Sequence, residues 1–387
     1  MSNSWKPSPL QELLLRAALF DGDAARTAWH AWIGQSGFSQ VDYGSYRLLP
    51  LVYLNLLKLE MQHPALPQLQ EMYRVTWYRN HLILRRAVKA LRLLREAEIP
   101  TLVLKACALI PLYYHDVAAR PMSDTDILVP TAHARRALQV LNAGGWFPRE
   151  RALEEMSEGY FTRLHAHTLT TADKFDLDLH RHVFHFETRD AGDEPFWEAS
   201  IPVELQNEKT RALSPADQLL HVCTHGAEWN PVPPVRWVAD ACMILQHAQV
   251  DWERFVHFAR VMRVVLVAQH ALTYLDSAMQ QNIPAYVFDA LRHTNITRLE
   301  RVHYDLLVHP HSQHNTALKL WYHYSRFRRV TQAYRGEPWL LRFPSFLRDT
   351  WDLQQTREVP RYMLRYAANR LARRFKPMPK FMSKDTR

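Results

Sequence analysis

Apolar residues recur every three or four positions over most of the first hundred residues, which is the period of an amphipathic α-helix. Ser8 followed by Pro9 is typical of the N-cap and first position of such a helix. The pattern is longest in VTWYRNHLILRRAVKALRLLREAEI, residues 75–99. We therefore expect an N-terminal helical lobe over residues 1–95.

The pattern changes near residue 96, where short apolar runs and alternating positions predict β-strands. IPTLVLK (99–105) and DTDILVP (124–130) are apolar runs, and KFDLDLHRHVF (174–184) alternates with period two. WFPRE and HAHTLTT are two further candidate strands, and helical segments lie between the earlier ones. The resulting order, β-α-β-α-β-β-β, indicates an α/β core over residues 96–205.

Helical periodicity returns after residue 205. LSPADQLLHVCTHGAEW opens with Ser214 as a predicted N-cap, Pro215 at the first position and Asp217 at the third. We expect a C-terminal helical lobe over residues 206–356. A basic amphipathic tail then covers residues 357–387.

Composition narrows the class of protein. The three cysteines form no CxxC pair, and no signal peptide is recognisable, so we expect a reducing, cytoplasmic setting. No apolar run reaches the roughly 18–20 residues that a membrane span needs. The GxGxxG and GxxxxGK[ST] phosphate-binding motifs are missing as well.

The net charge of +9 is concentrated at the C-terminus, because residues 357–387 hold ten Lys or Arg and two acids, a net charge of +8. A basic amphipathic helix can bind an acidic partner or an anionic membrane surface. It can also pack on a lobe and expose a solvated basic face, and both readings stay open. The sequence offers no recognisable aromatic stacking platform, so a nucleic-acid partner is not favoured.

Two candidate strands carry a concentration of carboxylates. Asp124 and Asp126 share one face of the first strand, and Asp176, Asp178 and His180 share one face of the second. If the strands are neighbours, the carboxylates converge and need a cation, and oxygen ligands suit Mg²⁺ or Mn²⁺. Metal ions held in such a cluster promote in-line phosphoryl or nucleotidyl displacement.

The plain alternative is that Asp124 is a solvated turn residue and that Asp126 merely begins a strand. Asp-x-Asp alone favours this alternative, because the spacing is common. Three features favour the functional interpretation instead. The pair adjoins an apolar strand, Arg120 stands four residues upstream, and a second acidic strand follows.

Three segments, taken in order, resemble a known family: LVLKACALIPLYYHDVAARPMSDTDILV, FDLDLHRHVF, and LSPADQLLHVCTHGAEW with the later RWVADACMIL. Over roughly residues 80–260 they are similar to the uncharacterised bacterial nucleotidyltransferase family, within the DNA polymerase β-like nucleotidyltransferase superfamily. The resemblance implies an α+β fold, with a small polymerase-β-like core containing a mixed sheet between N- and C-terminal helical lobes.

The resemblance also implies an activity, the Mg²⁺-dependent (or Mn²⁺-dependent) transfer of an NMP group from an NTP to a hydroxyl acceptor. Asp124 and Asp126 match the metal-binding aspartates of the family. Asp178 matches its third carboxylate, which helps to activate the attacking hydroxyl. The acceptor is left open by the sequence.

Further residues match positions suited to the nucleotide. The resemblance implies phosphate contacts for Lys105 and Arg120, and His180 falls on the strand histidine of the family. Ser123 is a candidate hydroxyl donor beside the aspartates.

Two later helical segments hold weaker candidates. His221 and His225 share a helix face, where hydrogen bonding in the core is favoured over a zinc site, and His225 is a candidate for the cleft. Arg236 is a candidate phosphate contact, although an Arg and an Asp four residues apart, here Arg236 and Asp240, most often form a pair of their own.

The chain departs from the family pattern at Ala106, where the family has glycine after the lysine, and Cys107 follows it. This departure motivates an alternative function. In that reading the chain is a catalytically degenerate binding or scaffold module in a biosynthetic or cell-surface pathway.

Overall fold

The computed structural model describes residues 5–39, 41–156, 160–161, 164–187, 191–229, 235–309, 316–328, 338–351 and 353–365. The chain divides into two compact units, Met1–Met156 with Leu164–Pro310, and Ser157–Arg163 with His311–Arg387. Most of the predicted basic tail, residues 366–387, lies outside the described residues. The proposed tail partners therefore stay predictions.

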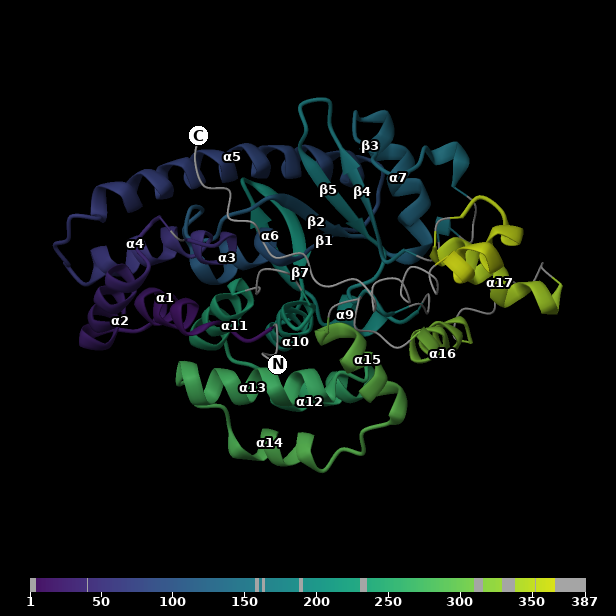
Figure 1. Ribbon diagram of the computed structural model, residues 1–387. Helices are drawn as coiled ribbons and strands as arrows, with labels where there is room; N and C mark the ends of the chain where they lie inside the picture. Colours follow the sequence, from purple (N-terminus) through teal and green to yellow (C-terminus); the bar gives the residue numbers. More distant parts are fainter. Residues whose placement is uncertain are drawn as a thin grey trace, which may run out of the picture. The chain divides into compact units, whose positions relative to one another are not determined.

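A seven-stranded mixed sheet lies in the first unit (Figure 1), in the order β3-β4-β5-β2-β1-β7-β6. Two neighbouring pairs, β2 with β5 and β1 with β7, are parallel, and the others are antiparallel. The strands are β1 (Leu102–Val103), β2 (Asp124–Leu128), β3 (Phe147–Pro148), β4 (Ala166–Thr170), β5 (Asp176–His180), β6 (Ile201–Leu205) and β7 (Glu208–Ala212). With the helices around it, this sheet confirms the α+β fold class.

Helices precede, interrupt and follow the sheet. The first group is α1 (Pro9–Leu19), α2 (Gly22–Gln35), α3 (Tyr43–Tyr46), α4 (Leu49–Lys58) and α5 (Leu66–Glu96). Between the strands lie α6 (Lys105–Leu109), the π-helix η1 (Ile110–Tyr114), the 3₁₀-helices η2 (Thr131–His133) and η3 (Leu153–Glu155), α7 (Ala134–Ala143) and α9 (Glu194–Glu198). After β7 come α10 (Pro215–Gly226), α11 (Arg236–His247), α12 (Trp252–Val261), α13 (Val265–Met279), α14 (Ala285–Arg292) and α15 (Arg298–Val308).

The predicted helix starts are confirmed. Ser8 forms a capping box with Gln11 at the start of α1. Ser214 accepts a hydrogen bond from the backbone N–H of Asp217 at the start of α10. In both cases the side-chain oxygen satisfies an N–H group that has no partner within the helix.

The hairpin of β6 and β7 was not predicted, and β7 lies beyond the expected end of the core at residue 205. Its turn uses two residues with positive φ, Gln206 at 46° and Asn207 at 68°, rather than glycine. Glu208 and Thr210 occupy buried positions of β7, so the strand lacks an apolar alternation. Two arginines of α5 pair with Glu208, which neutralises this buried carboxylate.

A large hydrophobic core lies among the described residues of the first unit. It includes Trp29 of α2, Leu56 of α4, Leu128 of β2, Leu220 of α10 and Leu272 of α13. The helices before and after the sheet thus bury their apolar faces together with residues of the sheet. The division into segments 1–95, 96–205, 206–356 and 357–387 stays a prediction.

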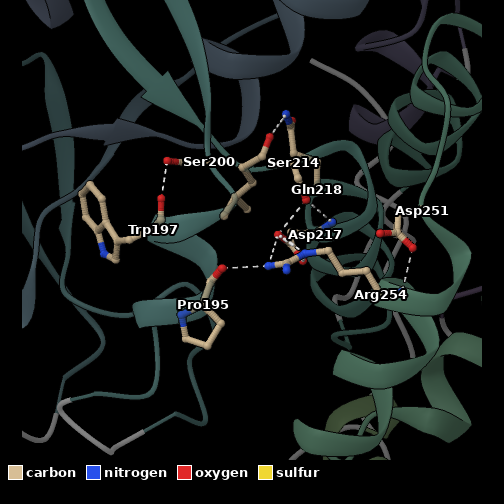
Figure 2. Close-up of polar contacts among 9 residues, drawn as sticks. Pro195, Trp197, Ser200, Ser214, Asp217, Gln218, Asp251 and Arg254 are labelled. Atoms are coloured by element: carbon tan, nitrogen blue, oxygen red, sulfur yellow. Dashed lines mark hydrogen bonds and ion pairs between the residues drawn. The ribbon is translucent and has the colours of Figure 1, made fainter.

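Helix α10 is fixed by a buried ion pair (Figure 2). Arg254 of α12 donates from Nε to Asp217 Oδ1 at 2.9 Å, and its Nη2 donates to the carbonyl oxygen of Pro195 at 2.8 Å. Asp217 is only 1% exposed. One guanidinium therefore joins α10 and α12 to the backbone of α9.

The second unit has its own small core, formed by Phe327, Phe346, Leu347 and Val359. Its described helices are α16 (Thr316–Phe327), α17 (Trp339–Thr350) and the 3₁₀-helix η6 (Thr356–Glu358). Within the described parts of the chain, no helix is both long enough and apolar enough to cross a lipid bilayer.

We expect Arg254→Gln to lower the free energy of unfolding by about 3 kcal/mol, because it leaves the buried Asp217 carboxylate without its cation. Urea unfolding followed by circular dichroism measures this loss. Arg260→Gln is the matched control, since Arg260 is an exposed residue of the same helix. Equal losses in the two variants would contradict a special role for the buried pair.

Candidate functional site

Parallel pairing of β2 with β5 brings the predicted carboxylates together. The register places Asp126 opposite Asp178, and Asp124 opposite Asp176. Residues two apart on a strand share a face, so His180 lies on the same face of β5 as Asp178. The condition stated for convergence of the carboxylates, that the two acidic strands are neighbours, is met.

Asp126 is the buried centre of this cluster, with 3% of its surface exposed. Its Oδ1 lies 2.7 Å from Lys105 Nζ and 3.0 Å from His180 Nε2. Burial would raise the pKa of the Asp126 carboxyl, but the charge of Lys105 and the contact with His180 outweigh burial and hold it well below its usual range. Asp126 is therefore an ionised carboxylate in a buried position.

Asp178 has the opposite electrostatic balance. Burial, together with the like charge of Asp126, raises the pKa of its carboxyl above the ordinary value. The Thr168 hydroxyl donates a hydrogen bond to Asp178 Oδ1 at 2.7 Å and limits this rise. The environment thus separates the two carboxyl groups in acidity, as is common where one of them handles a proton.

Asp126, Asp178 and His180 each offer a ligand atom, and these atoms lie within 4.8 Å of one another. Two carboxylates and an imidazole are a donor set that could hold a divalent cation. The Nδ1 of His180 is buried and has no hydrogen-bond partner among the described residues. The residues present therefore fit a divalent cation.

The backbone conformation at Lys105, the first residue of α6, bears on the missing glycine. The left-handed conformation falls on Lys105 itself, at φ 47°, and Ala106 does not share it. Ala106 therefore needs no glycine-like backbone, although its side chain is buried. Cys107 is also buried, which raises the pKa of its thiol to about 12 and keeps it protonated at neutral pH.

Asp124 is not part of the three-residue group. Its Oδ1 instead accepts a hydrogen bond from the Ser123 hydroxyl at 3.0 Å, at the beginning of β2. Arg47, which follows α3, reaches the same place and donates to Ser123 Oγ at 3.3 Å. The structure thus places Asp124 and Ser123 next to the cluster, at the N-terminal end of the central strand β2.

Arg120 is held by an acid from α11. Its Nε and Nη2 donate to the two carboxylate oxygens of Asp240, each at 2.7 Å. The Tyr114 hydroxyl donates to Asp240 Oδ1 at the same distance. Burial would lower the pKa of Arg120, but Asp240 raises it above the ordinary value, so this guanidinium is permanently charged and rigidly placed.

Arg236 lies close to these groups without a carboxylate of its own. Its Nη1 donates to the carbonyl oxygen of Pro121 at 3.1 Å, just before Ser123. Burial, and then the like charges of Arg120 and Arg47, lower its pKa to about 9. Neither Arg236 nor Arg47 forms an ion pair with an acid in the described part of the chain, so both could meet an anionic ligand.

The two histidines of α10 differ in their surroundings. His221 is buried, and burial with the charges of Lys105 and His180 lowers its pKa to about 3. His225 is half exposed, and its Nδ1 lies 3.7 Å from Glu228. Their rings stack with centroids 6.3 Å apart. The inner histidine, which the sequence did not single out for the cleft, is therefore a neutral imidazole next to the cluster.

The comparison with protein families finds a match over the part of the chain that contains these residues. Residues 45–280 match the model of a family described as uncharacterised nucleotidyltransferase. The match covers more than half of the 387 residues and includes every site residue discussed above. The chain belongs to this nucleotidyltransferase family.

This chain is similar in structure to an antigenic nucleotidyltransferase-like protein from Paracoccidioides brasiliensis, which is known from a crystal structure. The two are 12% identical, with 56% of this chain and 94% of that chain covered and a TM-score of 0.33. A similarity of this size supports no conclusion about the reaction. The comparison with curated proteins gives no match.

In this member of the nucleotidyltransferase family, sequence reasoning missed three partners that organise the site. Thr168 orients Asp178, Asp240 holds Arg120, and Arg47 approaches Ser123. Thr168 lies in the run HAHTLTT, which was expected to be a strand, but nothing in that run marks one threonine. The signal for Asp240 was present, although the sequence favoured pairing it with Arg236 in its own helix.

We expect Lys105→Met to destabilise the protein by about 3 kcal/mol, because the buried Asp126 loses its nearest cation. Millimolar Mn²⁺ should restore part of the loss, since a cation at the Asp126–Asp178–His180 group would stabilise the folded state by mass action. Thermal unfolding with and without the metal measures both effects.

The control for Lys105→Met is Lys89→Met, at an exposed lysine of α5. Its unfolding should change little, with or without Mn²⁺. A Lys105→Met protein as stable as this control would contradict the electrostatic account of Asp126.

Proposed function

We propose that this protein is a nucleotidyltransferase that moves an NMP group from an NTP to a hydroxyl acceptor, with Mg²⁺ or Mn²⁺ as cofactor. The observation that carries the proposal is the Asp126–Asp178–His180 group on two paired strands, in a chain of the nucleotidyltransferase family. The catalytic residues would be Asp124, Asp126 and Asp178.

Asp126 and Asp178 would hold the cation, with Asp124 supplying a further carboxylate from the same strand face. His180 would either join them as a ligand or fix the orientation of Asp126 through its Nε2 contact. The bound cation would offset the charge that develops on the phosphate oxygens during transfer. Carboxylate donors suit Mg²⁺, whereas a ligating imidazole would favour Mn²⁺.

Positively charged residues would bind the triphosphate. Lys105 lies against Asp126, and Arg236 and Arg47 are guanidinium groups without a carboxylate partner among the described residues. Arg120 would act as a positioning residue, because Asp240 already occupies two of its donor nitrogens. Ser123 and His225 stay candidates for contacts with the nucleotide.

Asp178 would receive the proton of the acceptor hydroxyl. The oxygen of that hydroxyl would attack the α-phosphorus of the NTP, and pyrophosphate would leave. The carboxylate of Asp178 is held by Thr168 and faces the buried Asp126 across the strand pair. Geometry of this kind lets one carboxylate polarise the nucleophile while its neighbour stays ionised.

We also propose that the core belongs to the DNA polymerase β-like superfamily, and that the protein is bacterial and cytoplasmic. The support for the superfamily is the Asp-x-Asp strand start beside a parallel strand that carries the third carboxylate. The three free, buried cysteines are compatible with a reducing setting.

A second candidate function is a non-catalytic binding or scaffold module. The observation that favours it is the position of Lys105, whose ammonium lies 2.7 Å from Asp126 and could replace a metal. Ala106 and Cys107 add to this interpretation, because the side chain of Ala106 hinders the close backbone approach that glycine allows, and Cys107 has no hydroxyl group. Calorimetry with each NTP and Mg²⁺ separates the two, since the module should bind none of the four.

We expect Asp126→Asn and Asp178→Asn each to weaken Mg²⁺-dependent NTP binding by about 100-fold or more, because each removes a carboxylate from the cation site. Calorimetry with and without Mg²⁺ measures the effect. The matched control is Asp176→Asn, on the same strand, because Asp176 pairs with Arg149 at 3.1 Å.

Binding that is unchanged in both Asp126→Asn and Asp178→Asn would reject the assignment of the cation site. An equal loss in Asp176→Asn would show that any lost charge near the strands matters, and would remove the argument for these two residues. The Asp124→Asn variant then reports whether the first aspartate contributes to the same site.

A further inference from the structure

A cavity of about 600 Å³ opens beside the beginning of β2. One wall is the exposed side of α5, from Glu71 to Ile83, and another is the β4–β5 turn at Lys174 and Phe175. Ser123 also lines the cavity, and its hydroxyl donates a hydrogen bond to Asp124. The cavity therefore adjoins the Ser123–Asp124 corner of the candidate site and has the volume of a small-molecule pocket.

The lining of this cavity combines an apolar surface with an aromatic one. Val75, Leu82 and the buried Ile83 contribute aliphatic surface from α5. Tyr78 and Phe175 contribute rings, and Tyr78 is 63% exposed. An exposed tyrosine next to an apolar surface is suited to stacking on a flat or apolar ligand.

Three cations and one acid complete the lining. The cations are Arg74, Arg79 and Lys174, and the acid is Glu71. None of the three cations forms an ion pair with an acid in the described part of the chain, and no acid occurs in the sequence between Glu71 and Glu96. With three cations and one acid, the side chains that line the cavity carry a net positive charge.

The wall formed by the β4–β5 turn is fixed to α5. Arg86 forms an ion pair with Asp173, and its guanidinium lies 5.2 Å from the centroid of the Phe175 ring. The Thr171 hydroxyl accepts a hydrogen bond from the backbone N–H of Phe175 at 3.0 Å. Phe175 is thus held in place before any ligand arrives, which lowers the entropic cost of binding.

We propose that this cavity is the acceptor site and that the acceptor is a small molecule with an apolar or aromatic body and an anionic group, such as a phosphate or carboxylate. The inference rests on the proposed function. The apolar body lies against Tyr78 and Phe175, and the anionic group meets Arg79 and Lys174. The acceptor hydroxyl then points past Ser123 to the aspartates.

The nucleotide and the acceptor would use different elements of the fold. The guanidinium groups assigned to the triphosphate come from Arg47 and from Arg236 of α11. The cavity is built by α5 and the β4–β5 turn. Because the Ser123–Asp124 corner borders both groups of residues, two ligands could meet there.

Helix α5 provides a control for charge alone. Arg85 and Lys89 are exposed, belong to the same helix and do not line the cavity. A long polyanion lying along α5 would use these two residues as well as the cavity, whereas a small acceptor would use only the cavity. The double variants Arg79→Gln/Lys174→Gln and Arg85→Gln/Lys89→Gln remove the same charge at the two places.

The test uses phenyl phosphate as the probe, with inorganic phosphate, neutral phenyl glucoside and a short single-stranded RNA as comparisons. Calorimetry on the full chain without NTP or metal gives each dissociation constant. We expect phenyl phosphate to bind best, and Arg79→Gln/Lys174→Gln to weaken it about tenfold or more through lost charge-assisted hydrogen bonds. Arg85→Gln/Lys89→Gln should change it less than about twofold.

Four results would overturn the inference. Phenyl phosphate could fail to bind. Inorganic phosphate could bind as tightly as phenyl phosphate, which would show that the apolar body contributes nothing to binding. Phenyl glucoside could bind as tightly as phenyl phosphate, which would show that the anionic group contributes nothing to binding. Tighter binding of RNA, lost equally in the two double variants, would assign the surface to a polymer. Thermal unfolding of each variant confirms that the comparison is between folded proteins.

These measurements are independent of the test of the proposed function. Probe binding needs neither NTP nor metal, so a protein without NTP binding still gives a clear result here. A protein that binds Mg²⁺-NTP but not phenyl phosphate keeps the proposed function and loses the acceptor site.

Discussion

The buried negative charge of Asp126 is the constraint on which the site depends. A carboxylate removed from water is tolerated only when cations and hydrogen-bond donors replace its hydration. Lys105 and His180 supply this replacement, and they come from the start of α6 and from β5, far apart in the sequence. The left-handed backbone at Lys105 and the parallel register of β2 with β5 can be understood as consequences, because both bring charged groups to one carboxylate.

Much of the fold could be predicted from local patterns. Period-two alternation marked β5, helical periodicity marked α5, and capping residues marked the starts of α1 and α10. These signals work because each reports which face of an element is buried. The hairpin of β6 and β7 was not predicted, for the same reason. Glu208 occupies a buried position of β7 and is neutralised by arginines of α5, so the buried positions of this strand show no apolar pattern in the sequence.

The candidate site was predictable as a set of residues but not as a geometry. The sequence placed Asp126, Asp178, His180 and Lys105 together through the strand pattern and the family resemblance. It did not separate Asp124 from the three-residue group, because spacing along one strand says nothing about a hydrogen bond to Ser123. The pairing of Arg120 with Asp240 joins positions 120 residues apart, and such contacts depend on tertiary packing.

The distribution of charge around the site favours a site that binds anions over a purely structural module. In a module, Lys105 alone would be enough to neutralise Asp126. Arg47, Arg236 and Arg79 would then add positive charge that no buried acid among the described residues requires. Burial, and then the like charges of Arg120 and Arg47, lower the pKa of Arg236, so holding this guanidinium there has a cost. Groups of like charge held together by several elements are typical of sites that bind anions. A triphosphate on one side of Ser123 and an anionic acceptor on the other would supply the missing negative charge.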